Sequence, residues 1–360
     1  MANRHDPTDL ISDPGVLQSD PLLEWGGWRG IEQGEGVCIL PWRADWLTAQ
    51  ARKLEAFPDV QHLGPGQFRQ TLVHLQKSRD ATWNDLHGAW SRLEPGGRLL
   101  LCGGNELGIV SAVKRLAREL DQAPQVLSNR RRARIVSFKR PADPCLEPTP
   151  PEPHRLWLPC PGSEPLEIEA EAGAFSARKI DSGTQMLLNA LADYGSTPES
   201  IFDLGCGIGC LGLAALKRWP SARATLADGD ARAIASAQRN AERLGVLARC
   251  EIVWWDAREP FPDQSGDLVL LNPPFHTGRA VDLEPARAMF KRAGESLKPG
   301  GTALIVANRT LPYEKDLQAV GRLQVLTETR HYKLLSLKRR SRSSSPNRAH
   351  SPGRRSTGSS

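Results

Sequence analysis

The sequence predicts an α/β protein built from two doubly wound domains in tandem. Segments that read as buried strands alternate with segments of helical pattern along most of the chain. Residues 93–101 (LEPGGRLLL) resemble residues 297–305 (LKPGGTALI), and each segment reads as a helix end, a Pro-Gly-Gly turn and a strand. Nine prolines between Pro141 and Pro165 separate the two halves. This internal similarity therefore predicts two copies of one domain, with a linker between them.

The first domain is predicted over residues 36–140. Residues 1–35 are polar and glycine-rich, and we expect them to form a loose lead-in. Within the domain, hydrophobic patterning predicts strands and helices in alternation. The predicted strands cover residues 37–40, 71–75, 98–102 and 133–138, and the predicted helices cover residues 80–93 and 108–120.

The second domain is predicted over residues 166–338, after a proline-rich linker at 141–165. Prolines lack the N–H group that regular structure needs, so the linker is expected to be irregular. Residues 339–360 are rich in Ser and Arg and are expected to be disordered. The predicted strands are residues 200–204, 222–227, 250–254, 267–271, 302–307, 324–329 and 332–337, and the helices are residues 210–218, 230–244 and 285–297.

The composition fits a two-domain protein of the reducing cytoplasm. At 360 residues and 39% hydrophobic content, the chain can build two apolar cores. No run of about 18 apolar residues occurs, which argues against a transmembrane helix, and the polar, acidic first 20 residues do not fit a secretory signal. The seven cysteines form no CxxC pair, so we predict no metal site and no disulfide framework.

The net charge of +6 is concentrated in two regions of the chain. Residues 338–360 contain seven Lys or Arg and no acid, and residues 1–140 contain 19 basic and 16 acidic residues. Residues 141–337 are therefore net acidic, at −4. The first domain and the tail should attract a polyanion such as nucleic acid. Arg130, Arg131 and Arg132 are the candidate phosphate contacts, and a solvated basic face is the alternative.

A glycine-rich loop, Asp203-Leu204-Gly205-Cys206-Gly207-Ile208-Gly209, lies where a predicted strand meets a predicted helix. Glycines at such a junction let the backbone approach a ligand closely. A dinucleotide site would have the spacing G-x-G-x-x-G. The spacing G-x-G-x-G with an acid two residues ahead favours S-adenosylmethionine instead, because Asp203 can receive the ammonium group of the methionine part.

Two further acids follow the next predicted strands. Asp228 can accept hydrogen bonds from both ribose hydroxyls of an adenosine. Asp256 can accept from the adenine amino group, with Trp255 or a neighbour against the ring. Asp230 is predicted to be the N-cap of the following helix. Each acid alone fits a surface carboxylate, but three acids at successive strand ends beside a glycine loop indicate a cofactor site.

The tetrapeptide Asn272-Pro273-Pro274-Phe275 follows the predicted strand at residues 267–271. Open α/β sheets bind ligands at the carboxyl ends of their strands. The two prolines remove two N–H donors, which leaves carbonyl acceptors, and the Phe275 ring can stack on a flat base. The motif therefore predicts a site that holds a planar amino group for alkylation. A simple Pro-Pro turn after a strand is the alternative.

Together these motifs resemble those of the class I S-adenosylmethionine-dependent methyltransferases. Among them, the chain is similar to the ribosomal RNA guanine-N2 methyltransferases, both the methyltransferase C type that acts on the small subunit and the methyltransferase G type that acts on the large one. The resemblance covers residues 36–338 and rests on residues 173–176, 181–184, 203–209, 272–278 and 307–313. It implies two tandem Rossmann-like methyltransferase domains, each a mainly parallel seven-stranded sheet with helices on both faces, the N-terminal one degenerate. It also implies that Phe175, Asp181 and Thr184 line the cofactor pocket.

The activity implied by the resemblance is methylation of the exocyclic N2 amino group of a specific guanosine in ribosomal RNA. We expect the Asn272 side-chain oxygen and the Pro273 carbonyl to accept from that amino group and to stabilise the positive charge that grows on it. Phe275 would stack on a base that has left its helix. His276 would contact phosphate or base, or serve only the turn.

Other activities also fit the motifs. The chain could methylate adenine N6 or a protein glutamine, since motifs like NPPF serve those reactions too. It could also be a non-catalytic RNA-binding factor in ribosome assembly. The expected partner is ribosomal RNA or a ribosomal subunit.

Overall fold

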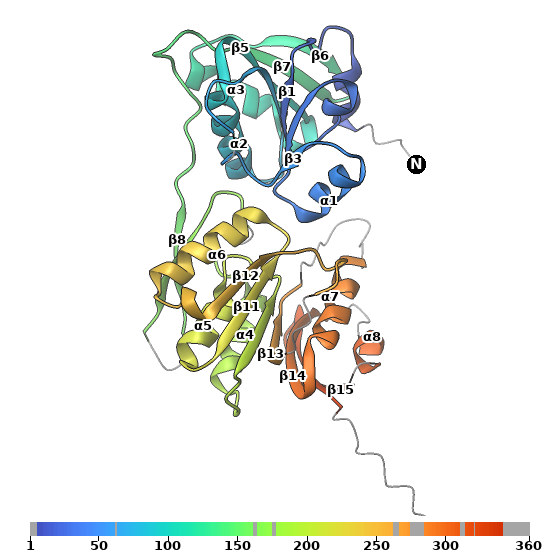
Figure 1. The fold of residues 1–360 in the computed structure, drawn as a ribbon, viewed down its shortest axis with the longest axis vertical. Helices are drawn as coiled ribbons and strands as arrows, with labels where there is room; N and C mark the ends of the chain where they lie inside the picture. The colour runs from blue at the N-terminus through green and yellow to red at the C-terminus, as the bar shows by residue number, and fades with distance from the viewer. Residues whose placement is uncertain are drawn as a thin grey trace, which may run out of the picture.

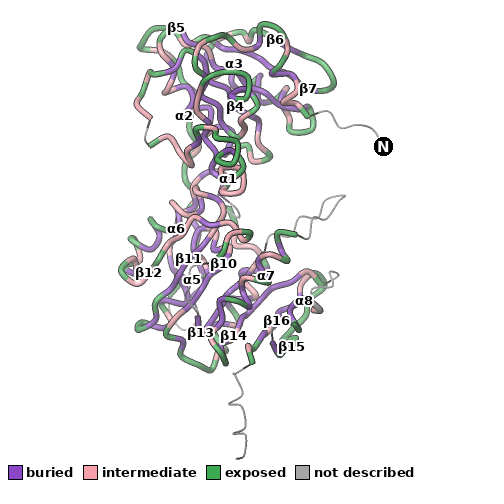
Figure 2. The backbone as a smooth tube through the Cα atoms, turned by 45° about the vertical axis from the view of Figure 1, so that its right-hand side comes forward, coloured by how far each residue is buried: buried purple, intermediate pink, exposed green. Residues whose placement is uncertain are grey.

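The computed structural model describes residues 6–61, 63–160, 164–174, 178–261, 266–273, 284–309, 314–319 and 321–340. They form two α/β domains connected by an extended segment (Figure 1). Buried strands run through the middle of each domain, and the exposed residues lie mainly in loops and on outer helix faces (Figure 2). Among the helices in these ranges, none has the length and apolar character needed to cross a membrane.

The first domain is centred on a seven-stranded sheet with the order β3-β2-β1-β4-β5-β7-β6. The strands from β3 to β5 are parallel to their neighbours, and β7 is antiparallel to both β5 and β6. The strands are β1 (Leu22–Trp25), β2 (Gly36–Ile39), β3 (Ala56–Phe57), β4 (Phe68–His74), β5 (Leu93–Gly104), β6 (Gln125–Arg130) and β7 (Ala133–Lys139), and the α-helices are α1 (Arg43–Ala51), α2 (Arg79–Ser91) and α3 (Ile109–Leu120).

The second domain has a sheet of the same design, with the order β12-β11-β10-β13-β14-β16-β15. Its strands are β10 (Ser200–Leu204), β11 (Arg223–Asp228), β12 (Cys250–Trp254), β13 (Gly266–Leu271), β14 (Leu297–Asn308), β15 (Gly321–Glu328) and β16 (Tyr332–Arg339). Its helices are α4 (Ser182–Ala192), α5 (Cys210–Arg218), α6 (Ala231–Arg243), α7 (Glu284–Glu295) and α8 (Glu314–Gln318). A separate hairpin of β8 (His154–Leu158) and β9 (Leu166–Ala170) precedes them.

The two sheets also share the conformation of the turn that follows their central strands β1 and β10. Gly26, directly after β1, has φ +76° and donates its N–H to the Ile39 carbonyl at 3.0 Å. Gly205, directly after β10, has φ +72° and donates to the Ala227 carbonyl at 2.8 Å. The predicted duplication of a mainly parallel, seven-stranded domain is therefore confirmed. The repeated Pro-Gly-Gly segments differ from the prediction only in belonging wholly to strands β5 and β14.

Burial explains why the central strands of the second sheet read as continuous apolar runs. Ile201, Leu268 and Leu270 pack on one face of the sheet, in a core shared with α4, α5 and α6. Phe202 and Val269 face the other way and pack with residues of α7. Because helices cover both faces, each position along β10 and β13 favours an apolar side chain.

The prediction of a loose lead-in over residues 1–35 is wrong for the described part. Strand β1 lies in the middle of the first sheet, between β2 and β4, and all four of its residues are buried. Leu10, Ile11 and Val16 are buried in the same domain core. The strand was not predicted because its apolar run is short and is bounded by Pro21 and Gly26, which are typical of loops.

The expectation that the whole segment 141–165 is irregular is also wrong. Residues His154–Leu158 form β8, which pairs with β9 along its full length. Pro153 and Pro159 flank the strand without interrupting it, so no ladder N–H is missing inside it. The elements α1, β3, β6, β9, α4 and α8 were not predicted either.

Candidate active site

The predicted site residues of the second domain converge on the carboxyl edge of its sheet. Asp203 lies in β10, Asp228 ends β11, and Asp256 and Asn272 follow β12 and β13 directly or within two residues. These four strands are adjacent in the order β12-β11-β10-β13. A cavity at this edge is lined by the glycine loop, by Asn272 and by the start of α4; its walls are Leu156, Ile180, Asp181, Thr184, Gly205, Cys206, Gly207, Ile208, Cys210, Leu211 and Asn272.

The glycine loop has the backbone that only glycine adopts easily. Gly205, Gly207 and Gly209 all have positive φ, at +72°, +55° and +91°. A Cβ added at Gly207 would meet no described atom within 4 Å, so this part of the loop borders open space. The loop therefore has room for a ligand at Gly207, and contact of the three glycines with S-adenosylmethionine stays a prediction.

Asp203 is buried beneath this loop. Its Oδ2 accepts from the Gly212 N–H at 2.8 Å, and burial raises the pKa of the carboxyl to about 7. Its Oδ1 is buried and has no hydrogen-bond partner among the residues that the structure describes. An unsatisfied carboxylate oxygen at this place fits a site for a cationic group, such as the ammonium of S-adenosylmethionine.

Asp228 connects the glycine loop to the turn that follows β11. It accepts from the Gly207 N–H at 2.8 Å and from the Asp230 N–H at 2.9 Å, and burial raises its pKa to about 6. Each carboxylate oxygen has a second lone pair, which fits the predicted contact with ribose hydroxyls. Asp230 caps α6 by accepting from the Arg232 N–H at 3.1 Å, so its predicted role is confirmed.

The raised pKa of Asp228 gives an expected pH dependence. Below pH about 6 the Asp228 carboxyl becomes protonated and loses acceptor capacity, and Asp203, with a pKa of about 7, becomes protonated in the same range. We therefore expect the Kd for S-adenosylmethionine to rise as the pH falls from 8 to 5. Calorimetry across this range measures the effect. Asp228→Asn should bind weakly throughout, with a smaller pH dependence. A Kd for the unaltered chain that stays constant from pH 8 to 5 would contradict the role of Asp228.

Asn272 is held by the first turn of α4. Its Nδ2 donates to Asp181 Oδ1 and to Thr184 Oγ1, each at 3.0 Å, and the Thr184 hydroxyl donates to Asp181 Oδ2 at 2.6 Å. Asp181 also caps α4 by accepting from the N–H groups of Gly183 and Thr184. Since a carboxylate only accepts, this network fixes which end of the amide carries the nitrogen. It leaves Asn272 Oδ1 available as an acceptor within the described part of the site.

Asp181 and Thr184 thus line the cavity and also orient Asn272. No local pattern in the sequence indicates this second role. Position 183, between these two residues in the sequence, needs a glycine, because the Cβ of any other residue would lie 2.6 Å from Asn272 Oδ1.

Asp256 lies at the same edge with its carboxylate already engaged. It accepts from the Arg258 backbone N–H at 2.9 Å and from Arg258 Nε at 2.7 Å. Trp255 is 5% exposed and packs edge-to-face on Phe261 at 5.0 Å between ring centroids, so it belongs to the core. The suggested place of Trp255 against the adenine ring is therefore wrong, while the adenine contact of Asp256 stays a prediction.

Several predicted residues lie elsewhere or outside the described part. Phe175, Phe275 and His276 are outside the described residues. Arg130 ends β6, and Arg131 and Arg132 form the turn to β7, at the carboxyl edge of the first sheet. Arg130 is paired with Asp13, and this contact lowers the pKa of the Asp13 carboxyl. Although Arg130 makes this contact, all three arginines are exposed, and their role as phosphate contacts stays a prediction.

The first domain has filled the position of its own equivalent site. Glu24 occupies the place in β1 that Asp203 has in β10, and His74 at the end of β4 corresponds in register to Asn272 after β13. Glu24 Oε1 lies 2.6 Å from His74 Nε2, and Glu24 Oε2 accepts from the Gly30 N–H at 2.9 Å. These contacts satisfy the acid internally, as expected of a degenerate copy.

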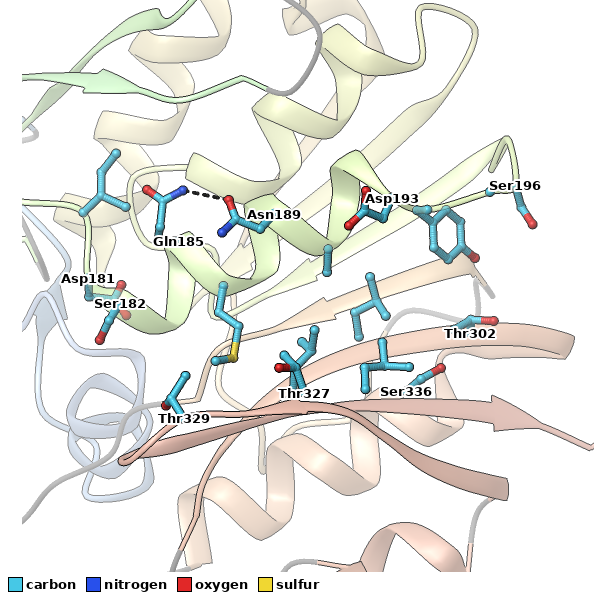
Figure 3. A pocket seen from close by; sticks show the side chains of 18 of the residues that line it. Asp181, Ser182, Gln185, Asn189, Asp193, Ser196, Thr302, Thr327, Thr329 and Ser336 are labelled. Atoms are coloured by element: carbon cyan, nitrogen blue, oxygen red, sulfur yellow. Dashed lines mark hydrogen bonds between the residues drawn. The ribbon is translucent and has the colours of Figure 1, made fainter.

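A groove that the sequence did not predict lies beside the site. It has a volume of about 1430 Å³ and runs along α4, opposite β14, β15 and β16 (Figure 3). Asp181 and Ser182 lie at one end of the helix and Asp193 and Ser196 at the other, with Thr327 and Ser336 across from them. The groove was missed because α4 itself was not predicted. Asp181 lines both the groove and the Asn272 cavity.

Comparisons with known proteins agree with this geometry. Residues 165–336 match the model of the methyltransferase small domain. The chain is 31% identical over 312 residues to the ribosomal RNA small subunit methyltransferase C of Hahella chejuensis, covering 84% of this chain and 88% of that protein. It is 32% identical over 332 residues to the protein of the same name from Pseudomonas aeruginosa, covering 90% and 91%.

A solved structure shares the whole architecture. It is the 16S rRNA N2 guanine methyltransferase of Thermus thermophilus in complex with AdoMet and guanosine. It superposes with a TM-score of 0.82 at 23% identity, over 94% of this chain and 93% of that one. The two-domain fold is therefore common to both proteins. With the sequence identity over most of its length, the chain belongs to the family of the ribosomal RNA small subunit methyltransferases C.

Proposed function

We propose that the chain transfers a methyl group from S-adenosylmethionine to the N2 amino group of a guanosine in ribosomal RNA. The observation that carries the proposal is the Asn272 amide, whose nitrogen is fixed by Asp181 and Thr184 and whose oxygen is left as an acceptor beside the glycine loop. The names of the relatives give the substrate class, and the name of the solved relative gives the N2 position.

The residues at the carboxyl edge fit the cofactor. Gly205 and Gly207 would lie against it, Asp228 would accept from its ribose, and the unsatisfied oxygen of Asp203 would face its ammonium group. When bound, S-adenosylmethionine supplies an electrophilic methyl group. The C–N bond would form as the C–S bond breaks, S-adenosylhomocysteine would leave, and the nitrogen would release one proton to solvent. The chain itself therefore needs to bind, orient and stabilise charge.

The chemistry of the amino group explains the choice of Asn272. An exocyclic nitrogen shares its lone pair with the base ring and is a poor nucleophile. Hydrogen bonds from its protons to Asn272 Oδ1 and to the Pro273 carbonyl localise that lone pair on nitrogen. Both acceptors also stabilise the positive charge that develops there. An amide is neutral, so it does this without forming a fixed ion pair with the substrate.

Fixing the amide before the base arrives saves reorganisation during the reaction. Asn272 Nδ2 is tied to Asp181 and Thr184, which are themselves joined by a hydrogen bond of 2.6 Å. The amide therefore cannot rotate to present its nitrogen without breaking two hydrogen bonds. This arrangement supports a catalytic role for Asn272 and positioning roles for the other two residues.

Removing one of these contacts should slow methyl transfer. Thr184→Val keeps the shape of the side chain but removes one hydrogen bond to the amide, which contributes about 1 kcal/mol. We therefore expect the rate of methyl transfer to fall roughly fivefold to tenfold. Single-turnover methylation measures the effect. Thr184→Ser is the matched control because it keeps the hydroxyl group. Equal rates for the two variants would show that the hydroxyl does not position Asn272.

The RNA would be drawn to the net acidic second domain by basic groups elsewhere. We propose Arg130, Arg131 and Arg132, all three of them exposed, as phosphate contacts of the first domain. The site of action would be the cytoplasm, and the substrate would be either free ribosomal RNA or an assembled ribosomal subunit. His276, Phe275 and Phe175 keep the roles predicted for them from sequence.

Incubating the full chain with radiolabelled S-adenosylmethionine and ribosomal RNA, either free or in small subunits, tests the proposal. We expect labelled N2-methylguanosine after digestion to nucleosides. Labelled N6-methyladenosine would contradict the choice of base. Cofactor binding without transfer to either form of RNA would favour a non-catalytic role in ribosome assembly.

A further inference from the structure

The two domains meet through corresponding turns. The turn after β2 leads into α1, and the turn after β11 leads into α6, so the two turns hold the same place in their domains. The Arg43 N–H donates to the Gly229 carbonyl at 2.8 Å, and the Ala231 N–H donates to the Pro41 carbonyl at 2.9 Å. This reciprocal pair forms a short antiparallel bridge between the domains. On the second domain it lies directly after Asp228.

The side chain of Arg43 reaches a second turn of the catalytic domain. Its guanidinium donates to both carboxylate oxygens of Glu259, with Nε and Nη2 at 2.9 and 2.8 Å. The same group lies 4.6 Å from the ring centroid of Trp46 and 5.0 Å from that of Trp254. Both partners of the ion pair are partly buried, with side chains 22% and 25% exposed. A bidentate ion pair of this kind fixes the relative orientation of the two side chains in addition to stabilising their contact.

Glu259 in turn is hydrogen-bonded to the backbone of Asp256, so Arg43 and Asp256 are connected through it. Its Oε2 accepts from the Asp256 N–H at 3.2 Å, and its own N–H donates to the Asp256 carbonyl at 2.9 Å. The Trp254 indole N–H also donates to the carbonyls of Pro41 and Gly229, at 3.1 and 3.0 Å. The turns after β11 and β12 are thus tied to each other and to the first domain.

A separate set of contacts reaches Asp230 and the segment before α4. Arg232 pairs with Asp230 at 2.9 Å and donates through Nη1 to Gln76 of the first domain at 3.2 Å. Asp80, in the first turn of α2, accepts from Arg178 at 2.7 Å, three residues before Asp181. Each contact from the first domain therefore ends within a few residues of a predicted cofactor ligand or of Asp181.

We propose that the first domain, whose own site is filled, serves to pre-form the cofactor site of the second. Arg43 is the main positioning residue. It touches no predicted cofactor ligand itself. Its backbone N–H holds the turn after Asp228, and its guanidinium, which alanine removes, holds the turn that carries Asp256 through Glu259. A site ordered in advance loses less conformational freedom when the ligand binds, so affinity rises without any new contact to the ligand. This inference rests on the proposed function, because it concerns the binding of S-adenosylmethionine.

Arg115 provides a matched control for Arg43. It lies on α3, pairs with Glu119 at 2.6 Å and stacks over Trp83 at 3.9 Å, so it makes the same kinds of contact inside the first domain. In Arg43→Ala we expect the Kd for S-adenosylmethionine to rise about tenfold, the lower end of the loss seen when a residue that orients a metal-binding side chain is removed. Arg115→Ala should keep the original Kd. Calorimetry on the full-length variants gives these values directly.

Steady-state kinetics and a double mutant separate positioning from general damage. The KM for S-adenosylmethionine should rise in Arg43→Ala while kcat at saturating cofactor stays unchanged. Glu259→Ala should raise the KM for S-adenosylmethionine equally. The double variant should have the same KM as either single variant, because both changes remove the same contact between Arg43 and Glu259.

An unchanged Kd in Arg43→Ala, an equal loss in Arg115→Ala, or additive losses at Arg43 and Glu259 would overturn the inference. If the unaltered chain binds no S-adenosylmethionine, the proposed function fails together with it. The two failures are therefore distinguishable from the first titration.

Discussion

Replacing Asn272 by alanine is expected to lower the rate of methyl transfer by about 100- to 1000-fold, the usual cost of losing one pre-oriented group that stabilises transition-state charge. The Asn272 oxygen is the side-chain acceptor that the Asp181 and Thr184 network leaves available for the amino group. Cofactor affinity should be nearly unchanged, because the glycine loop and Asp228 belong to other strand ends.

Two measurements together test this expectation. Single-turnover methylation of ribosomal RNA gives the rate, and calorimetry with S-adenosylmethionine gives the affinity. Thermal unfolding shows whether the variant remains folded. A rate within about threefold of the original, equivalent to less than 1 kcal/mol, would remove Asn272 from the mechanism.

Replacing Gly207 by valine is expected to abolish binding of S-adenosylmethionine. The residue has φ +55°, and its added side chain would extend into open space at the cavity rather than against protein. A branched side chain there obstructs the backbone that the cofactor must approach, and the left-handed conformation costs a further 1–3 kcal/mol or so. Calorimetry on the folded variant measures the loss.

Gly245 supplies the control for backbone strain. It has φ +67°, also has open space around an added Cβ, and lies in the turn after α6 rather than at the cavity. Gly245→Val should lose similar stability and still bind S-adenosylmethionine. If Gly207→Val also binds with the original affinity, the cofactor does not lie against this loop.

Much of the second domain could be predicted because its signals are local. Strands β10 and β13 are buried on both faces and read as continuous apolar runs. Helix α5 follows the glycine loop, and helix α6 begins after the capping residue Asp230. The glycine loop and the acids at strand ends follow from the same local order. Parallel topology then brings them to one edge of the sheet.

Contacts between distant residues could not be predicted in this way. Asn272 is 91 residues from Asp181, and Arg43 is 216 residues from Glu259. Their pairing depends on where α4 and the first domain pack, which no local pattern encodes. Strand β1 was missed for a different reason. Its four residues are too few to give a recognisable hydrophobic pattern, and they form a central strand only because the rest of the domain buries them.

The charge distribution and the structure give a consistent division of labour between the domains. The second domain carries the acids proposed to bind the cofactor, and residues 141–337 are net negative. The first domain carries the exposed arginines of the β6–β7 turn and the contacts that hold the cofactor turns. Glu24 and His74 fill the place in the first domain that corresponds to the predicted cofactor site of the second.

The most direct test of guanine-N2 methylation is to measure modified nucleosides in ribosomal RNA from cells that lack this chain. Mass spectrometry of digested RNA should show the loss of one N2-methylguanosine. The unaltered chain should restore it, and Asn272→Ala should not. An unchanged N2-methylguanosine content, or the loss of N6-methyladenosine instead, would contradict the assignment.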